Sequence, residues 1–258
     1  MNENIKKRVY FDYNVFVNYI NLKEVKHEIE KKQDEFIYVY SPAFLEEVAN
    51  IKGDKNRIKT YISQMSNLYS NKILIPTDYA GIQLMEEHPQ QCYNRVIRHY
   101  SWTEIANEIS QMFLLQKPHF KDIREEHGIT TVEINNIAPE NLFNDQRINE
   151  FLKRNLGFFN LSFFEGDKLA EWLNINKEFH LIQEKISNLF DALEMLGFYP
   201  EKEGAYSSRM HDVTHAIYGT QADFLVTEDN RFSQKCKAAY HFLGVPTKVI
   251  SYKEFTEF

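Results

Sequence analysis

The stretch FLVTEDNRF (224–232) decides the fold expected for this chain of 258 residues. It opens with a short apolar run that predicts a buried strand, and the run stops at Thr227. Two acids follow, Glu228 and Asp229, before a segment with helical spacing over about 230–242. Ligands of parallel α/β sheets bind outside the carboxyl ends of the strands. An acid at this tip therefore indicates a candidate functional site.

Both ends of the chain alternate apolar strands with amphipathic helices. Further strands are predicted at 8–11, 36–40, 72–76 and 247–251. Strands that are apolar throughout and separated by helices are typical of a parallel sheet covered on both faces. Residues 1–77 and 201–258 are therefore predicted to form the two halves of one α/β domain.

The intervening residues, 78–200, have a different texture. Long amphipathic segments such as 102–116 and 179–197 predict helices, and strand signals are almost absent. We expect a helical insertion subdomain that packs on the sheet domain, because apolar helix faces need a partner.

Composition limits the classes of protein that the chain can be. The net charge of −7 argues against a broad basic surface that binds duplex DNA. No apolar run is long enough to span a bilayer, and the N-terminus lacks a secretory signal, so we expect a cytoplasmic protein without membrane contact. The two cysteines lack metal-site spacing and are expected to be small packing residues. Local basic groups are interpreted as solvated faces, at Lys6 to Arg8, Lys52, Lys55, Arg57, Lys59, Lys153 and Arg154.

Four acids fall where the predicted topology brings them to one edge of the sheet. Asp12 ends the first strand, Glu47 lies in the helix after the second, Asp212 begins the helix before FLVT, and Asp229 follows that strand. One such acid is explained as a helix cap. Four together would raise one another's pKa unless a cation neutralised them. Carboxylate oxygens suit Mg²⁺ or Mn²⁺, so the cluster predicts a divalent metal.

In the same order along the chain, FDYNVFV, SPAFLEEV, HDVTHA and VTEDNRF resemble the motifs of PIN-domain nucleases. The resemblance covers about residues 8–75 and 205–252. It implies a PIN-like α/β/α three-layer fold with a central parallel sheet, interrupted here by the helical insertion. It also implies a metal-dependent phosphodiesterase in which the acids Asp12, Glu47, Asp212 and Asp229 hold one or two Mg²⁺ or Mn²⁺ ions.

The resemblance implies supporting roles for three other residues. Asn14 would orient Asp12, and Thr227 would hydrogen-bond a carboxylate or the phosphate, although both residue types are also local turn formers. Arg231 occupies the position at which many family members carry another acid, so it would weaken the binding of a second metal ion or contact a phosphate.

The neighbouring acids leave a choice of ligand open. Glu46 adjoins Glu47, and Glu47 is preferred because the acid of the family is usually followed by an aliphatic residue, here Val48. Asp223 is expected to close the turn before the FLVT strand, and Glu228 to point away from the site.

Three other interpretations compete with the nuclease. His211, Asp212 and His215 could belong to an HD-type metal phosphohydrolase or to a His-xxx-His zinc pair. The chain could be a catalytically silent PIN-like binding module that acts through its insertion. The aromatic segment 151–164 could stack bases, although core packing is the preferred interpretation.

The nucleic acid and its regulation are expectations by analogy with the family. The analogy favours single-stranded RNA over DNA as the substrate. Because an active nuclease requires restraint, we also expect an inhibitory or regulatory protein partner.

Overall fold

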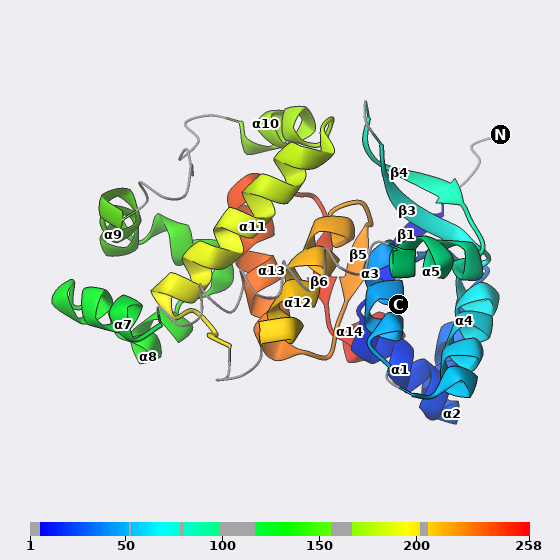
Figure 1. Cartoon of the computed structure of the whole chain (residues 1–258). Helices are drawn as coiled ribbons and strands as arrows, with labels where there is room; N and C mark the ends of the chain where they lie inside the picture. Colours follow the sequence, from blue (N-terminus) through cyan, green and yellow to red (C-terminus); the bar gives the residue numbers. More distant parts are fainter. Residues whose placement is uncertain (1–5, 52, 78–79, 99–116, 156–166, 202–205) are drawn as a thin grey trace.

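A parallel sheet of four of the five predicted strands lies at the centre of the protein (Figure 1), and the fifth, at 72–76, pairs antiparallel in a hairpin instead. The computed structural model describes residues 6–51, 53–77, 80–98, 117–155, 167–201 and 206–258. The strands are β1 (Lys7–Phe11), β2 (Phe36–Val39), β5 (Phe224–Val226) and β6 (Lys248–Ile250), in the order β2-β1-β5-β6. All three pairings are parallel, and β1 and β5 are central.

A β-hairpin extends the sheet beyond β2. It consists of β3 (Lys72–Thr77) and β4 (Gly81–Glu86), which pair antiparallel. β3 joins the end of β2 because the Tyr40 N–H donates to the Lys72 carbonyl at 3.1 Å and the Leu74 N–H donates to the Tyr40 carbonyl at 2.7 Å. β4 lies inside the predicted insertion, residues 78–200, where strand signals in the sequence are almost absent, and it is the one strand that the described part of that segment contains.

Helices account for most of the remaining described chain. Those of the sheet domain are α1 (Tyr13–Asn21), α2 (Lys23–Lys31), α3 (Pro42–Ala49), α4 (Lys55–Tyr69), α5 (Pro89–Arg98), α12 (Tyr206–Gly219), α13 (Asn230–Leu243) and α14 (Tyr252–Thr256). Those between are α7 (Lys117–Glu126), α8 (Thr131–Asn135), the 3₁₀ helix η1 (Pro139–Asn144), α9 (Gln146–Asn155), α10 (Lys168–Ile175) and α11 (Phe179–Leu196). The helix expected at 102–116 and most of the aromatic segment 151–164 lie outside the described residues. None of the helices in the described ranges is both long and apolar enough to cross a bilayer.

The two faces of the sheet are covered by different helices. Successive strand residues point to opposite faces. On one face the Tyr10 ring lies 5.5 Å from Phe44 of α3 and 5.7 Å from His215 of α12. On the other face the Phe11 ring lies 5.3 Å from Phe255 of α14. Helices on both faces are compatible with a three-layer α/β/α architecture.

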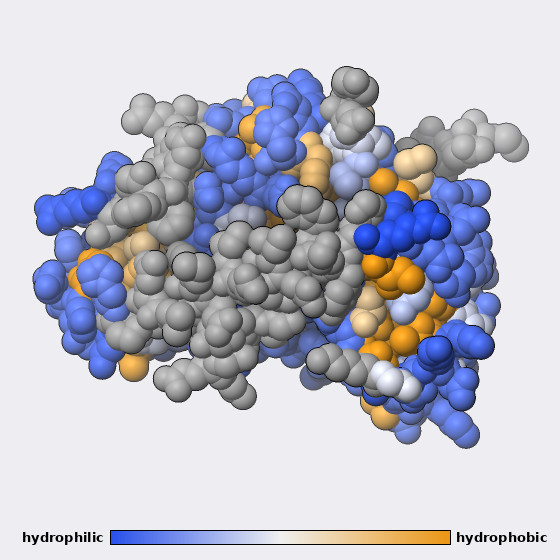
Figure 2. All heavy atoms as spheres, viewed as in Figure 1, coloured by the Kyte–Doolittle hydropathy of each residue, from blue (hydrophilic) through white to orange (hydrophobic). Residues whose placement is uncertain are grey.

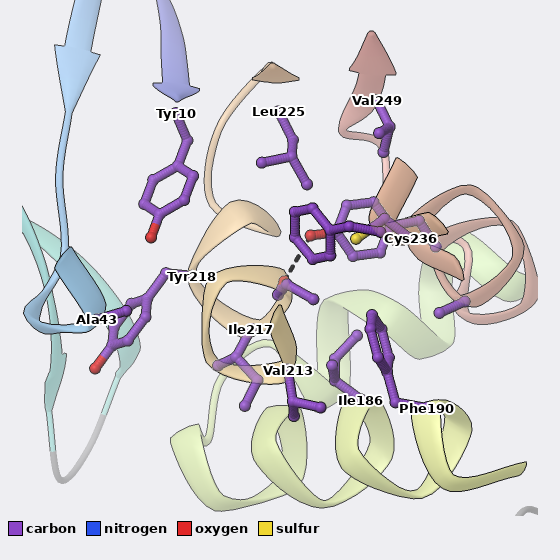
Figure 3. Close-up of a cluster of buried hydrophobic side chains, with 14 of the residues drawn as sticks. Tyr10, Ala43, Ile186, Phe190, Val213, Ile217, Tyr218, Leu225, Cys236 and Val249 are labelled. Carbon is purple, nitrogen blue, oxygen red and sulfur yellow. Dashed lines mark hydrogen bonds between the residues drawn. The ribbon is translucent and has the colours of Figure 1, made fainter. Parts of the chain in front are cut away.

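The insertion shares its core with the sheet domain. Figure 3 shows Ile186 and Phe190 of α11 beside Ile217 of α12 and Cys236 of α13. Burying side chains of this size contributes about 1.5 to 3 kcal/mol each. Cys236 and Cys92 are both buried and unpaired, in the packing role that the sequence predicted.

Candidate active site at the carboxyl edge of the sheet

The strand order reverses between β1 and β5, and two of the candidate acids, Asp12 and Asp229, follow these strands at their carboxyl ends. From β1 the chain continues outward to β2 and β3, whereas β5 and β6 lie on the other side of β1. The Asp12 N–H donates to the Val226 carbonyl at 2.8 Å, so the ends of β1 and β5 are joined here. Such a reversal is where ligands bind in open α/β sheets.

Asp12 is buried, with 4% of its surface exposed, and both of its oxygens are engaged. Its Oδ1 accepts from the Tyr13 N–H at 2.7 Å, as the cap of α1. Its Oδ2 accepts from the Thr227 hydroxyl at 2.9 Å and from Asn14 Nδ2 at 3.3 Å. The structure thus places the two expected supporting residues on one carboxylate oxygen.

Asp229 is the cap of α13, so helix capping accounts for one of its oxygens. Its Oδ1 accepts from the Phe232 N–H at 3.0 Å, while Oδ2 accepts no hydrogen bond within the described ranges. The Asp229 N–H donates to the Thr227 hydroxyl oxygen at 3.0 Å. The Thr227 hydroxyl therefore connects the Asp12 carboxylate to the start of α13.

Glu47 is held by a buried network that crosses three elements. His215 Nε2 lies 2.8 Å from Glu47 Oε1, and His215 Nδ1 lies 2.6 Å from the Tyr10 hydroxyl. The Tyr10 hydroxyl in turn lies 2.7 Å from Ser41 Oγ, at the start of α3. The network fixes the orientation of Glu47. The sequence pattern does not indicate this contact, although His215 lies one turn after Asp212 on the same side of α12.

The adjacent acid, Glu46, lacks such a network. It makes no hydrogen bond within the described part of the chain, and its pKa is raised by burial and by the neighbouring Glu47 carboxylate. Glu47 is also close enough to Asp12 to raise the pKa of that carboxyl. Of the two neighbours, Glu47 is the one that faces the other acids.

Asp212 is electrostatically coupled to two of the other acids. Burial raises its pKa well above the usual range, and the Asp12, Glu201 and Asp229 carboxylates raise it further, whereas the Lys235 ammonium opposes the shift. Acids from β1, α12 and α13 therefore share one electrostatic environment.

The pKa values of the other buried groups at this edge shift in the directions that burial dictates. Burial raises the pKa of Asp12, against the opposing effect of His215, and raises the pKa of Glu47 to about 7. Burial lowers the pKa of His215 to about 4. The unfavourable charges at this edge are therefore relieved only in part by the protein.

The two histidines of α12 do not form a metal pair. Both ring nitrogens of His215 are occupied. His211 Nε2 lies 3.0 Å from Asn50 Nδ2, and its buried Nδ1 has no hydrogen-bond partner among the described residues. These contacts argue against the His-xxx-His zinc pair. The parallel sheet around α12 also argues against an HD-type hydrolase, which is all-helical.

Arg231 and the two flanking acids lie outside the cluster. Arg231 is half-buried and makes no hydrogen bond or ion pair with the described residues. Glu228 accepts from the Tyr252 N–H at 2.9 Å, and Asp223 accepts from the Arg8 N–H at 2.7 Å, before β5. The Asp223 carboxylate thus binds the start of β1, a contact between strands and not the turn closure that the sequence predicted.

The carboxylate oxygens are chemically suited to a hard divalent cation, but their positions do not form a coordination site for one. Within the described ranges, no group of three His, Cys, Asp or Glu side chains stands in a geometry that would hold a metal ion. The cluster nevertheless offers carboxylate oxygens with raised pKa values, together with the unpartnered His211 Nδ1. Binding a cation would require carboxylates to turn away from their present partners, such as His215.

Comparisons of this chain with protein-family models, with curated proteins and with solved structures found no match.

Proposed function

We propose that the protein is a metal-dependent nuclease that hydrolyses phosphodiester bonds, with single-stranded RNA as the first substrate to test. The observation that supports the proposal is that Asp12 and Asp229 follow the adjacent strands β1 and β5, where the strand order reverses, and that both carboxylates act on Asp212. These carboxylates raise the pKa of Asp212, an unfavourable arrangement that a bound cation would relieve. The choice of RNA over DNA rests on the resemblance to PIN-domain nucleases alone.

The proposal gives each residue of the cluster a role. Asp12, Glu47, Asp212 and Asp229 would hold one or two Mg²⁺ or Mn²⁺ ions. Such ions, when bound, polarise the scissile phosphate and lower the pKa of the attacking water.

The supporting residues would act on these acids or on the substrate. Thr227 and Asn14 fix Asp12 through its Oδ2, and His215 orients Glu47. Arg231, which has no described partner, is available for a phosphate oxygen.

The test is cleavage of labelled single-stranded RNA and DNA in Mn²⁺ or Mg²⁺, compared with EDTA. Asp229→Asn is the most informative variant, because asparagine also caps helices and α13 should remain intact. Asp167→Asn is the matched control, since Asp167 caps α10 in the same way outside the cluster. We expect Asp12→Asn and Asp229→Asn to lose metal-dependent cleavage and Asp167→Asn to keep it.

Two outcomes would refute the proposal. Equal background cleavage by wild type and by both site variants would favour the catalytically silent binding module. Cleavage that persists in EDTA would exclude the metal mechanism. An inhibitory protein partner belongs to the proposal only if cleavage is observed.

A further inference from the structure

A strip of side chains leads from the acidic cluster to an exposed arginine. The Tyr13 ring follows Asp12 directly and lies 6.5 Å from the Tyr61 ring. The Arg57 guanidinium lies 5.2 Å from the centre of the Tyr61 ring. Arg57 also donates to the Tyr61 hydroxyl from Nη2 at 2.9 Å and from Nε at 3.3 Å. We name Tyr13, Tyr61 and Arg57 the tyrosine–arginine strip.

The Arg57 guanidinium forms no ion pair with a described carboxylate, although the hydrogen bonds to Tyr61 and, more weakly, the nearby Asp54 carboxylate raise its pKa. The Arg57 side chain is exposed, and no described carboxylate lies within ion-pair distance of its guanidinium. Asp54 binds the backbone N–H of Arg57, at 2.9 Å, as the cap of α4. The guanidinium is therefore held by Tyr61 and remains free to bind an anion.

Two more cations lie near Arg57 at the start of α4. Lys55 and Arg57 lie in the first turn, where the helix dipole disfavours cations and the Asp54 cap offsets them, and Lys59 lies one turn after Lys55. All three side chains are exposed, and in a chain with a net charge of −7 they form a local basic group that is open to an anionic ligand.

The surface beside the strip is apolar. Figure 2 shows apolar side chains gathered over the region of α1, α3 and α4, bordered by hydrophilic ones. Tyr13 of α1, Ile58 of α4 and Ile51 in the connection between α3 and α4 are only partly buried. An apolar surface bordered by cations suits a strand that carries both bases and phosphates.

We propose that the tyrosine–arginine strip binds a single-stranded nucleic acid beside the scissile bond, with Arg57 on a backbone phosphate and Tyr13 against a base. The inference rests on the proposed function and names the surface that would bring the substrate to it. Tyrosine rings stack on unpaired bases, which a duplex does not present. Because Tyr61 already orients the guanidinium, binding a phosphate costs less conformational entropy.

The test measures binding rather than cleavage. An Asp12→Asn background is used to prevent hydrolysis, with a fluorescent oligouridine of about 12 nucleotides and fluorescence anisotropy as the readout. We expect Arg57→Ala to raise Kd about tenfold, the loss typical of one charged hydrogen bond. The slope of log Kd against log salt should fall by about 0.7, the value for one phosphate contact on a single strand.

Two further variants distinguish binding at the tyrosine–arginine strip from non-specific attraction between charges. Arg154→Ala removes the same charge from an exposed arginine on α9, at the opposite end of the molecule in Figure 1, and should leave Kd unchanged. Arg57→Lys keeps the charge but loses the planar contact with Tyr61, and should give an intermediate Kd.

The outcomes distinguish this inference from the proposed function. If wild type cleaves RNA while Arg57→Ala binds the oligonucleotide with a Kd within about twofold of its parent, the proposed role of the strip is wrong and the proposed nuclease function is unaffected. An equal loss of affinity in Arg154→Ala would also refute binding at the strip. So would equal affinity for a duplex of the same length. If the parent binds no oligonucleotide and wild type cleaves none, both proposals fail.

Discussion

Replacing Glu47 by glutamine should stabilise the metal-free protein at alkaline pH. Burial raises the pKa of Glu47 from 4.5 to about 7, and its side chain is only 21% exposed. At about 1.4 kcal/mol for each pKa unit, ionising this buried carboxyl costs the folded state about 3 kcal/mol. Glutamine has the same shape and can still accept a hydrogen bond from His215, but it carries no charge.

The sign of the pH dependence follows from proton uptake. The folded protein binds the Glu47 proton more tightly than the unfolded chain does, so its free energy of unfolding falls as pH rises between 4.5 and about 7. His215 acts in the opposite direction, since its pKa is lowered to about 4, but it is present in both proteins and cancels in the comparison. The advantage of Glu47→Gln should therefore grow from about 1 kcal/mol at about pH 5 to about 3 kcal/mol at about pH 8.

The assay is urea unfolding in EDTA at several pH values, followed by circular dichroism. Glu126→Gln is the control, because it removes the same charge from an exposed glutamate on α7 and should change stability by less than about 0.5 kcal/mol at every pH. Saturating Mg²⁺ should reduce the advantage of the glutamine variant by stabilising wild type selectively. A difference between wild type and Glu47→Gln that stays constant across the pH range would refute the electrostatic description of the cluster.

Three further substitutions test the structure around the cluster. Lys235→Met removes the buried cation that pairs with Glu194 at 3.2 Å, and urea unfolding should show a loss of about 3 to 5 kcal/mol. Thr227→Val removes the acceptor of the Asp229 N–H, and the same measurement should show a loss of about 1 to 3 kcal/mol. Gly81→Ala places a Cβ 2.2 Å from the Asn176 carbonyl oxygen at a φ of +63°, so Tm should fall and limited proteolysis should cut the β3–β4 hairpin faster.

The elements of the sheet domain could be predicted because their signals are local. The buried run at β5 ends where Thr227 begins the turn, and Asp229 caps the helix that follows. The pattern of β4 is weaker, since Ile82 and Leu84 alternate with the exposed Gln83 and Met85 over only a few residues. A short edge strand of this kind carries little periodicity, and the helical signals that follow it dominated the interpretation.

The individual acids could be predicted from the sequence, but their contacts could not. The Thr227 hydroxyl reaches Asp12 across 215 residues of sequence, a contact that only the parallel pairing of β1 and β5 creates. His215 likewise contacts Glu47 and Tyr10, which lie on elements far away in the sequence. Helical spacing places His215 near Asp212, but nothing local indicates which carboxylate it will meet.

The insertion contributes to the electrostatics of the candidate site as well as to its core. Glu194 of α11 pairs with the buried Lys235 of α13, and Lys235 is the group that opposes the rise in the pKa of Asp212. Arg209, one turn before Asp212 on α12, is also buried and interacts with that carboxylate. Without the acid on α11, Lys235 would be a buried cation with less compensation, which destabilises a folded protein. The helix that the sequence marks as an insertion therefore helps to hold the Lys235 side chain beside Asp212, which links the packing of α11 to the electrostatics of the cluster.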